Sequence, residues 1–247
     1  SEMCIRDRFI LSTCFSDLYS QISTDRPNQT ESPFALPMGH IQIETGISIE
    51  DSQSNITTLF RIGIINGIEI RLNSNYLMND NITVLKKSSF SDFEVGAKFK
   101  IWGESNDKTK IGFLTHLSIP TAPEVFSNNE YGLLSRVLIS HDLINDSQIG
   151  YNLGYNKYSN YNGELIYTIE YGRSLGSFGV FFELFGNESS NNSSLNFDSG
   201  IIYLIDNDKQ LDLSIGRGLN NDMFYVSAGF SIDTVSYTHL RAHETRH

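Results

Sequence analysis

The chain has 247 residues, of which 39% are hydrophobic and 12% aromatic, and its formal charge is -11. This charge argues against nucleic acid as a partner, because phosphate binding requires clustered Lys and Arg. The sequence has no apolar run of the roughly 18 residues that a membrane helix needs, whereas a spanning strand needs only about 9–11 residues.

The two ends of the chain carry strings that we expect to lie outside the folded protein. Residues 1–8 and 233–247 have the form of translated sequencing-adaptor read-through, which we expect to contribute nothing to the fold. Residues 9–20 match the rear of a signal peptide, with Cys14 as a lipoprotein acceptor in the alternative interpretation. Cys4 and Cys14 both precede residue 21, so we expect no disulfide in the mature protein.

Residues 21–38 are rich in Pro and polar groups, and they are predicted to form an irregular N-terminal segment. From Gly39 to Ile232, apolar and polar residues then alternate one by one. In 40–50, four isoleucines fall on one face and the acidic and amide side chains on the other, as in a strand with one apolar side. Twelve strands are predicted, at 39–50, 55–65, 68–76, 91–102, 110–120, 131–142, 147–157, 163–172, 178–186, 195–205, 210–218 and 223–232.

The connections between these strands differ in length. Asn66-Gly67 is a two-residue hairpin signal, because both positions accept a positive φ. Other short connections lie near 103–109, 143–146, 173–177 and 206–209, and longer, Asn/Ser-rich ones lie near 77–90, 121–130, 158–162 and 187–194. This alternation is typical of outer-membrane barrels, which have short periplasmic turns and longer external loops.

Alternation by itself fits both a soluble sandwich and a membrane barrel. Tyrosines such as Tyr155 and Tyr171 near strand ends fit an interfacial aromatic girdle, and the strands are longer than the usual five or so residues. Together with the leader, these features predict an all-β fold. We expect a single antiparallel up-and-down transmembrane β-barrel of about twelve strands over 39–232, integral to a bacterial outer membrane. Outer-membrane lipid, lipopolysaccharide and the barrel-assembly machinery are its expected partners.

A further clue is the segment Thr24-Asp25-Arg26-Pro27, followed by Glu31-Ser32 and by Gly39-His40-Ile41-Gln42-Ile43-Glu44. It resembles the opening of a family of outer-membrane transporters named for the MetA pathway of phenol degradation. The stretches 140–143 (SHDL) and 150–155 (GYNLGY) also resemble that family, so the likeness covers about 21–232. The resemblance implies an outer-membrane barrel that passes small, often hydrophobic or aromatic compounds. The chain departs from such barrels at its C-terminus, where no aromatic insertion signal follows Ile232.

The polar face of the predicted strands would line the lumen. It carries the candidate solute-contacting residues Arg61, Arg71, Lys98, Lys100, Arg136, Glu69, Glu94, His116, Glu170 and Glu183. Leucines and phenylalanines, among them Leu114, Leu134 and Phe185, share this face, and a mixed lining suits a small, partly hydrophobic solute such as an aromatic acid. The alternative is a lumen plugged by salt bridges, because unpaired charges are costly to bury. We expect 21–38 to tuck into the periplasmic mouth, with Asp25 and Arg26 paired to lumen charges.

The predicted function is therefore an outer-membrane channel for a small-molecule solute, without catalysis, cofactor or metal. Two non-transporting alternatives remain. A lipid hydrolase would use His116 and Ser118, which share the lumen face, as base and nucleophile. A structural or adhesive barrel would bind cells through the 77–90 loop.

Overall fold

The computed structural model describes residues 21–50, 53–79, 87–104, 106–190 and 192–235. The expected adaptor string 1–8, the expected leader remnant 9–20 and residues 236–247 of the expected tail lie outside the described residues. The described part of the chain contains no helix with the length and hydropathy needed to cross a bilayer.

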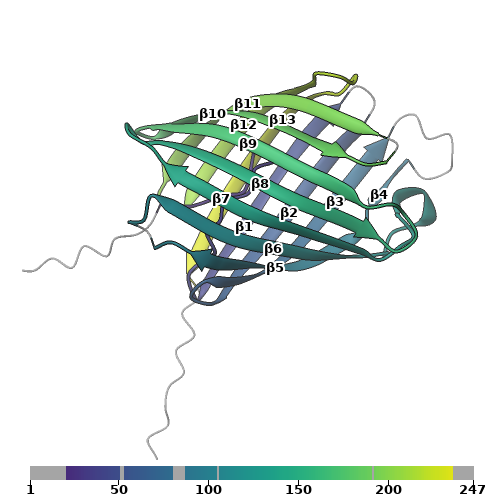
Figure 1. Ribbon diagram of the computed structural model, residues 1–247, viewed down its shortest axis with the longest axis horizontal. Helices are drawn as coiled ribbons and strands as arrows, with labels where there is room; N and C mark the ends of the chain where they lie inside the picture. Colours follow the sequence, from purple (N-terminus) through teal and green to yellow (C-terminus); the bar gives the residue numbers. More distant parts are fainter. Residues whose placement is uncertain (1–20, 51–52, 80–86, 105, 191, 236–247) are drawn as a thin grey trace, which may run out of the picture.

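Twelve long antiparallel strands close into a barrel, as the sequence predicted. Neighbours in the chain are neighbours in the sheet, and β1 pairs with β13 to complete the ring. Figure 1 shows the strands steeply tilted around a common axis, as closure of a sheet requires. The elements are β1 (His40–Glu50), β2 (Gln53–Ile65), β3 (Ile68–Asn79), β4 (Ser88–Phe90), β5 (Phe93–Trp102), β6 (Thr109–Ile119), η1 (Glu124–Phe126), β7 (Gly132–Asp142), β8 (Ser147–Tyr158), β9 (Glu164–Leu175), β10 (Phe178–Glu188), β11 (Ser193–Asp206), β12 (Lys209–Gly218) and β13 (Phe224–Val235).

The observed strands differ from the predicted ones in several details, among them β3, which ends at Asn79 instead of 76. A thirteenth strand, β4, pairs only with the end of β3, in a stretch that was expected to be loop. β9 runs on to Leu175, beyond the expected boundary at 172. β13 runs on to Val235, so Asp233 belongs to the barrel rather than to the tail, and its carboxylate lies 2.8 Å from Nδ1 of His40 on β1.

The apolar faces of the strands point outward and the charged faces point inward. Leu153 on β8 and Leu213 on β12 leave 57% and 60% of their surface exposed, whereas Arg61 and Glu69 are completely buried. A soluble sandwich would bury the leucines and expose the charges. This inversion is the arrangement of a membrane barrel, in which the exposed apolar belt meets lipid.

Turns and loops divide between the two ends of the barrel. The short-turn end carries the connections 66–67, 103–108, 143–146, 176–177 and 207–208, and the long-loop end carries 91–92, 120–131, 159–163 and 219–223. By the rule for outer-membrane barrels, the short-turn end faces the periplasm.

Residues 21–38, which we call the N-terminal segment, form neither strand nor helix and lie inside the barrel. Near its start, the amide of Ile22 donates to the carbonyl of Asn207, 2.7 Å away, and just past its end the amide of Gly39 donates to the carbonyl of Gly63 at 3.0 Å. Both contacts are near the short-turn end. Between them, the amide of Gln29 donates to Glu183 on the far wall at 2.7 Å. The segment therefore enters the lumen, crosses it and returns.

Candidate functional site

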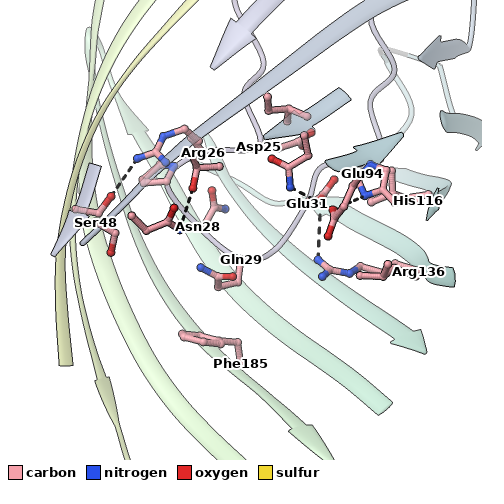
Figure 2. A pocket seen from close by; sticks show the side chains of 18 of the residues that line it. Asp25, Arg26, Asn28, Gln29, Glu31, Ser48, Glu94, His116, Arg136 and Phe185 are labelled. Carbon is pink, nitrogen blue, oxygen red and sulfur yellow. Dashed lines mark hydrogen bonds and ion pairs between the residues drawn. The ribbon is translucent and has the colours of Figure 1, made fainter. Parts of the chain in front are cut away.

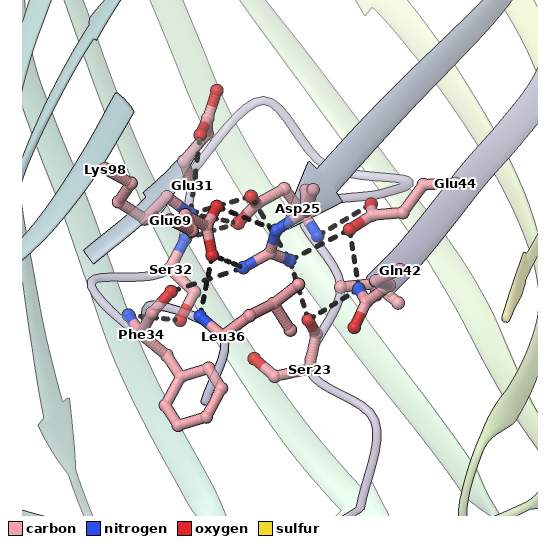
Figure 3. A network of polar contacts seen from close by, with 12 residues as sticks. Ser23, Asp25, Glu31, Ser32, Phe34, Leu36, Gln42, Glu44, Glu69 and Lys98 are labelled. Atoms are coloured by element: carbon pink, nitrogen blue, oxygen red, sulfur yellow. Dashed lines mark hydrogen bonds and ion pairs between the residues drawn. The ribbon is translucent and has the colours of Figure 1, made fainter. Parts of the chain in front are cut away.

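An ion cluster at the centre of the lumen joins the N-terminal segment to the barrel wall (Figure 3). Arg61 on β2 lies directly opposite Arg71 on β3, a pairing of like charges that is unfavourable by itself. The carboxylate of Glu69 bridges the two guanidinium groups, 2.9 Å from Arg61 Nη2 and 3.1 Å from Arg71 Nη1. This central ion cluster consists of Asp25, Glu31, Glu44, Arg61, Glu69, Arg71 and Lys98.

Arg61 organises one half of the cluster. Its Nη1 donates to Glu44 Oε1 on β1 at 2.9 Å and to the carbonyl of Ser23 at 2.8 Å, while Nη2 donates to the carbonyl of Phe34 at 3.3 Å. One buried guanidinium thus holds two strands and both arms of the N-terminal segment. Its planar fork of five donors suits this many-sided contact.

Asp25 organises the other half. Its carboxylate lies 2.6 Å from Arg71 Nη1, 2.7 Å from Lys98 Nζ and 3.5 Å from Arg61 Nη1. Burial by itself would raise the pKa of Asp25, but the charges of Arg61, Lys98 and Arg71 outweigh it and hold this pKa well below 3.8. Asp25 is therefore an ionised carboxylate that anchors the segment.

Barrel carboxylates also bind the backbone of the N-terminal segment. Glu44 Oε2 accepts hydrogen bonds from the amides of Asp25 and Arg26, at 2.9 and 3.0 Å. Glu69 Oε2 accepts the amide of Leu36 at 2.7 Å. These bonds satisfy donors of an irregular backbone that would otherwise be buried without partners.

The opposite wall, on β9 to β11, is acidic. Glu183 accepts a hydrogen bond from the hydroxyl of Thr30 at 2.5 Å, in addition to the one from the Gln29 amide. Glu170 accepts a hydrogen bond from Asn28. Asp198 on the neighbouring strand accepts a hydrogen bond from Tyr225. On this side the N-terminal segment is held by hydrogen bonds from its own neutral groups to the carboxylates of the wall, rather than by ion pairs.

A cavity of about 480 Å³ lies on the long-loop side of the N-terminal segment (Figure 2). Its volume falls in the range of small-molecule sites. Segment residues from Asp25 to Glu31 form its floor, and residues close to the long loops, such as Asn55 and Met223, lie at its other end. The walls combine charged or polar side chains with apolar ones: Arg71, Asn73, Glu94, His116, Arg136 and Tyr225, and Leu59, Leu114, Leu134 and Phe185.

Nine of the ten lumen residues proposed from the sequence fall into three groups. Those that line the cavity are Arg71, Glu94, His116 and Arg136; those buried in the ion cluster beneath it are Arg61, Glu69 and Lys98; and those on the acidic wall are Glu170 and Glu183. Lys100 belongs to none of these groups. Although it shares one strand face with Lys98, Lys100 lies at the end of β5 and pairs at 2.9 Å with the exposed Glu104.

The N-terminal motif contributes Asp25 and Glu31 to the ion cluster, and Arg26 pairs with Asp212 on β12 at 3.2 Å. Thr24 donates a hydrogen bond to the carbonyl of Arg26 at 2.8 Å, and Pro27 lies at the cavity floor. Asn73 and Tyr225 were not among the proposed residues. Strand parity alone could have placed both on the lumen face.

His116, the residue on which a hydrolase would depend, is engaged elsewhere. Its Nε2 accepts a hydrogen bond from Arg71 Nε at 3.2 Å, and its Nδ1 lies 3.6 Å from Glu94. A general base needs a free nitrogen aimed at the nucleophile. The arrangement around His116 instead links β6 to the ion cluster.

Comparisons with solved structures show the same fold at low identity. An outer membrane channel from Pseudomonas putida F1 superposes with a TM-score of 0.61 at 13% identity, covering 84% of this chain and 99% of that one. The KdgM porin in complex with disordered oligogalacturonate gives 0.58 at 13%, covering 77% and 98%. The NanC porin gives 0.58 at 15%, covering 78% and 98%. No curated protein matches the chain.

The family comparison covers most of the chain. The model described as "Putative MetA-pathway of phenol degradation" matches residues 24–236, from the N-terminal motif through the last strand. The match, the closed barrel and the outward apolar belt agree with one another. The chain therefore belongs to this family, and it is an outer-membrane β-barrel with the fold of known channels and porins.

Proposed function

We propose that the barrel is an outer-membrane channel for a small, partly hydrophobic solute, which enters at the long-loop end and occupies the cavity above the N-terminal segment. The observation that supports this is the mixed lining of the cavity. Arg136 and His116 alternate with Leu114 and Leu134 on the paired strands β6 and β7. A wide aqueous porin gains nothing from these leucines, whereas a solute with polar and apolar parts can use both kinds of contact.

The N-terminal segment lies between this cavity and the short-turn end. A solute that continues towards the periplasm has to pass beside the segment or displace part of it. The segment is anchored by buried ion pairs at Asp25, but on the acidic wall it is held only by hydrogen bonds from neutral donors, which are easier to exchange with water or solute. We therefore place the solute site above the segment and the controlling step at the segment itself.

Single-channel recording tests the proposal. Purified barrel in a planar bilayer is expected to carry ionic current, and Leu134→Trp is expected to reduce it by filling the cavity. Leu133→Trp is a matched control, because Leu133 is the next residue on β7 but points outward, with 55% of its surface exposed. The shift in gel mobility on heating verifies that each variant is folded.

The outcomes separate clearly. A folded wild-type barrel that carries no current contradicts channel function. Equal currents from the two tryptophan variants would show that the cavity is not part of the conducting path. Loss of current in the Leu134 variant alone supports the route through the cavity.

A further inference from the structure

Arg136 is the cation in the cavity whose hydrogen-bonding capacity is least used. A guanidinium carries five N–H donors. Within the described residues, the only carboxylate in ion-pair distance of Arg136 is Glu31, with 3.8 Å between Nη1 and Oε1, and no hydrogen bond reaches its guanidinium. Arg61, in contrast, donates to four groups, the carboxylates of Glu44 and Glu69 and two backbone carbonyls, and is fully buried. The side chain of Arg136 keeps 23% of its surface exposed to the cavity.

Glu31, the partner of Arg136, is fixed by its backbone rather than by its carboxylate. Its amide donates to Asn152 Oδ1 at 2.7 Å, and Asn152 Nδ2 donates back to its carbonyl at 3.0 Å. Its Oε2 is buried, yet it accepts no hydrogen bond from the described part of the chain. It is held by the charges of Arg71 Nη2 at 3.0 Å and Lys98 Nζ at 3.6 Å. The carboxylate can therefore turn away from Arg136 while the backbone stays in place.

The wall beside Arg136 has space for this side chain and carries an apolar surface. Gly154 lies opposite Arg136 on β8, where a Cβ atom would come within 2.7 Å of Arg136 Cγ, so the glycine makes the room that the arginine occupies. Leu134 is two residues before Arg136 on the same face of β7, about 7 Å along the strand. Figure 2 shows Phe185, from β10, facing the same cavity as Arg136 and Glu31.

We propose that the solute is an organic carboxylate, whose carboxylate binds Arg136 in place of Glu31 and whose apolar body lies between Leu134 and Phe185. This inference rests on the proposed channel function and specifies the class of its solute. A planar carboxylate can accept two parallel N–H bonds from a guanidinium, a geometry that Glu31 does not reach from 3.8 Å.

The charges around the site explain why Glu31 has to yield. Glu94 lies on the same side of the cavity and accepts a hydrogen bond from Asn73 at 3.2 Å. If Glu31 stayed in place, an incoming carboxylate would meet two like charges, Glu31 and Glu94. With Glu31 turned towards Arg71 and Lys98, the carboxylate of the solute takes the place of the Glu31 carboxylate at Arg136. One negative charge then replaces another. A neutral or cationic solute cannot take the place of the Glu31 carboxylate at the guanidinium, so it gains nothing from Arg136.

Current block by matched aromatic probes tests this assignment. Benzoate, benzyl alcohol and benzylamine have similar size but carry a negative, zero and positive charge. Benzoate is expected to block the wild-type current at the lowest concentration. Arg136→Gln is expected to raise the half-blocking concentration of benzoate at least about tenfold, because a hydrogen bond to a charged group is lost. The half-blocking concentration of benzyl alcohol should stay within about twofold of its wild-type value. Arg217→Gln, at an exposed position outside the cavity lining, is the control and should change neither value.

Glu31→Gln gives a second, independent measurement. Removal of the competing carboxylate should lower the half-blocking concentration of benzoate several-fold without a comparable effect on benzyl alcohol. The carboxylate assignment is wrong if Arg136→Gln changes the half-blocking concentrations of all three probes equally, or if Glu31→Gln raises that of benzoate. Neither result would contradict the channel function. Absence of current from the folded wild-type barrel instead contradicts the proposed function itself.

Discussion

The carboxylate of Asp25 lies 2.7 Å from the ammonium nitrogen of Lys98, although 73 positions separate the two residues in the chain. Asp25 belongs to the irregular segment inside the barrel, and Lys98 belongs to its wall. Both side chains are almost completely buried. Their contact shows that the N-terminal segment is part of the folded lumen, with its own charges matched to those of the wall.

Asp25→Asn should destabilise the barrel strongly. The substitution keeps the shape of the side chain but leaves Arg71 and Lys98 short of one counter-charge, and breaking a buried ion pair costs about 3–5 kcal/mol. Urea unfolding in lipid vesicles measures the free energy of unfolding. Glu104→Gln is the control, because its pair with Lys100 is exposed and its loss should change stability by less than about 0.5 kcal/mol. Equal effects of the two substitutions would contradict the anchoring role of Asp25.

The stabilisation by Asp25 should persist down to mildly acid pH. The neighbouring cations hold the pKa of Asp25 well below 3.8, against the opposing effect of burial. A carboxyl group whose pKa is lower in the folded state stabilises that state above its unfolded pKa, and this stabilisation is lost as the pH falls through the folded pKa. We expect the difference in urea midpoint between wild type and Asp25→Asn to be the same at pH 7 and pH 5, and to shrink below about pH 3.8. A difference that already disappears at pH 5 would show that burial, rather than the neighbouring cations, dominates and raises the pKa of Asp25.

Leu153→Arg tests the orientation of the barrel wall. Leu153 is central in β8 and points outward, so an arginine there meets hydrocarbon and should cost about 2–4 kcal/mol in a lipid bilayer. Leu153→Ile, which keeps the apolar character, should cost less than about 1.5 kcal/mol. Urea unfolding in vesicles again provides the measurement. Tolerance of arginine would mean that this face meets water.

Gly154→Ala tests the space beneath Arg136. An alanine Cβ would lie 2.7 Å from Arg136 Cγ and 2.8 Å from the carbonyl oxygen of Ser135, so both side chain and backbone have to shift. Overpacking of this kind costs about 1–3 kcal/mol. Gly179→Ala is the matched control, because its Cβ would meet Ile202 at an ordinary 3.5 Å. A thermal or urea midpoint unchanged by Gly154→Ala would contradict the tight contact.

The sequence predicted the twelve long strands because each has one apolar face, and alternation over about ten residues is a strong local signal. It missed β4, which has only three residues, Ser88 to Phe90, and is too short to show a period. Parity also placed Lys100 on the lumen face. What parity does not give is depth along the barrel, and Lys100 lies at the rim while Lys98 is buried at the centre.

The partners of the lumen charges were harder to infer than their orientation. Hairpin pairing placed Arg61 near Arg71 and Glu69, because neighbouring strands fix the register. The contacts of Asp25 with Lys98, and of Glu31 with Arg136, depend on how an irregular segment crosses the lumen. No local pattern in the sequence encodes that path, so these contacts follow only from the closed structure.

The pairing of β1 with β13 sets the order of assembly. These two strands come from opposite ends of the described chain, so the seam between them can form only after the last strand has been exported. Residues 21–38 lie within the wall that this seam completes. The segment therefore gains its full set of wall partners, which include Glu44 on β1, only when this seam is closed, and the final step of biogenesis should be slow, because it joins the most distant parts of the polypeptide.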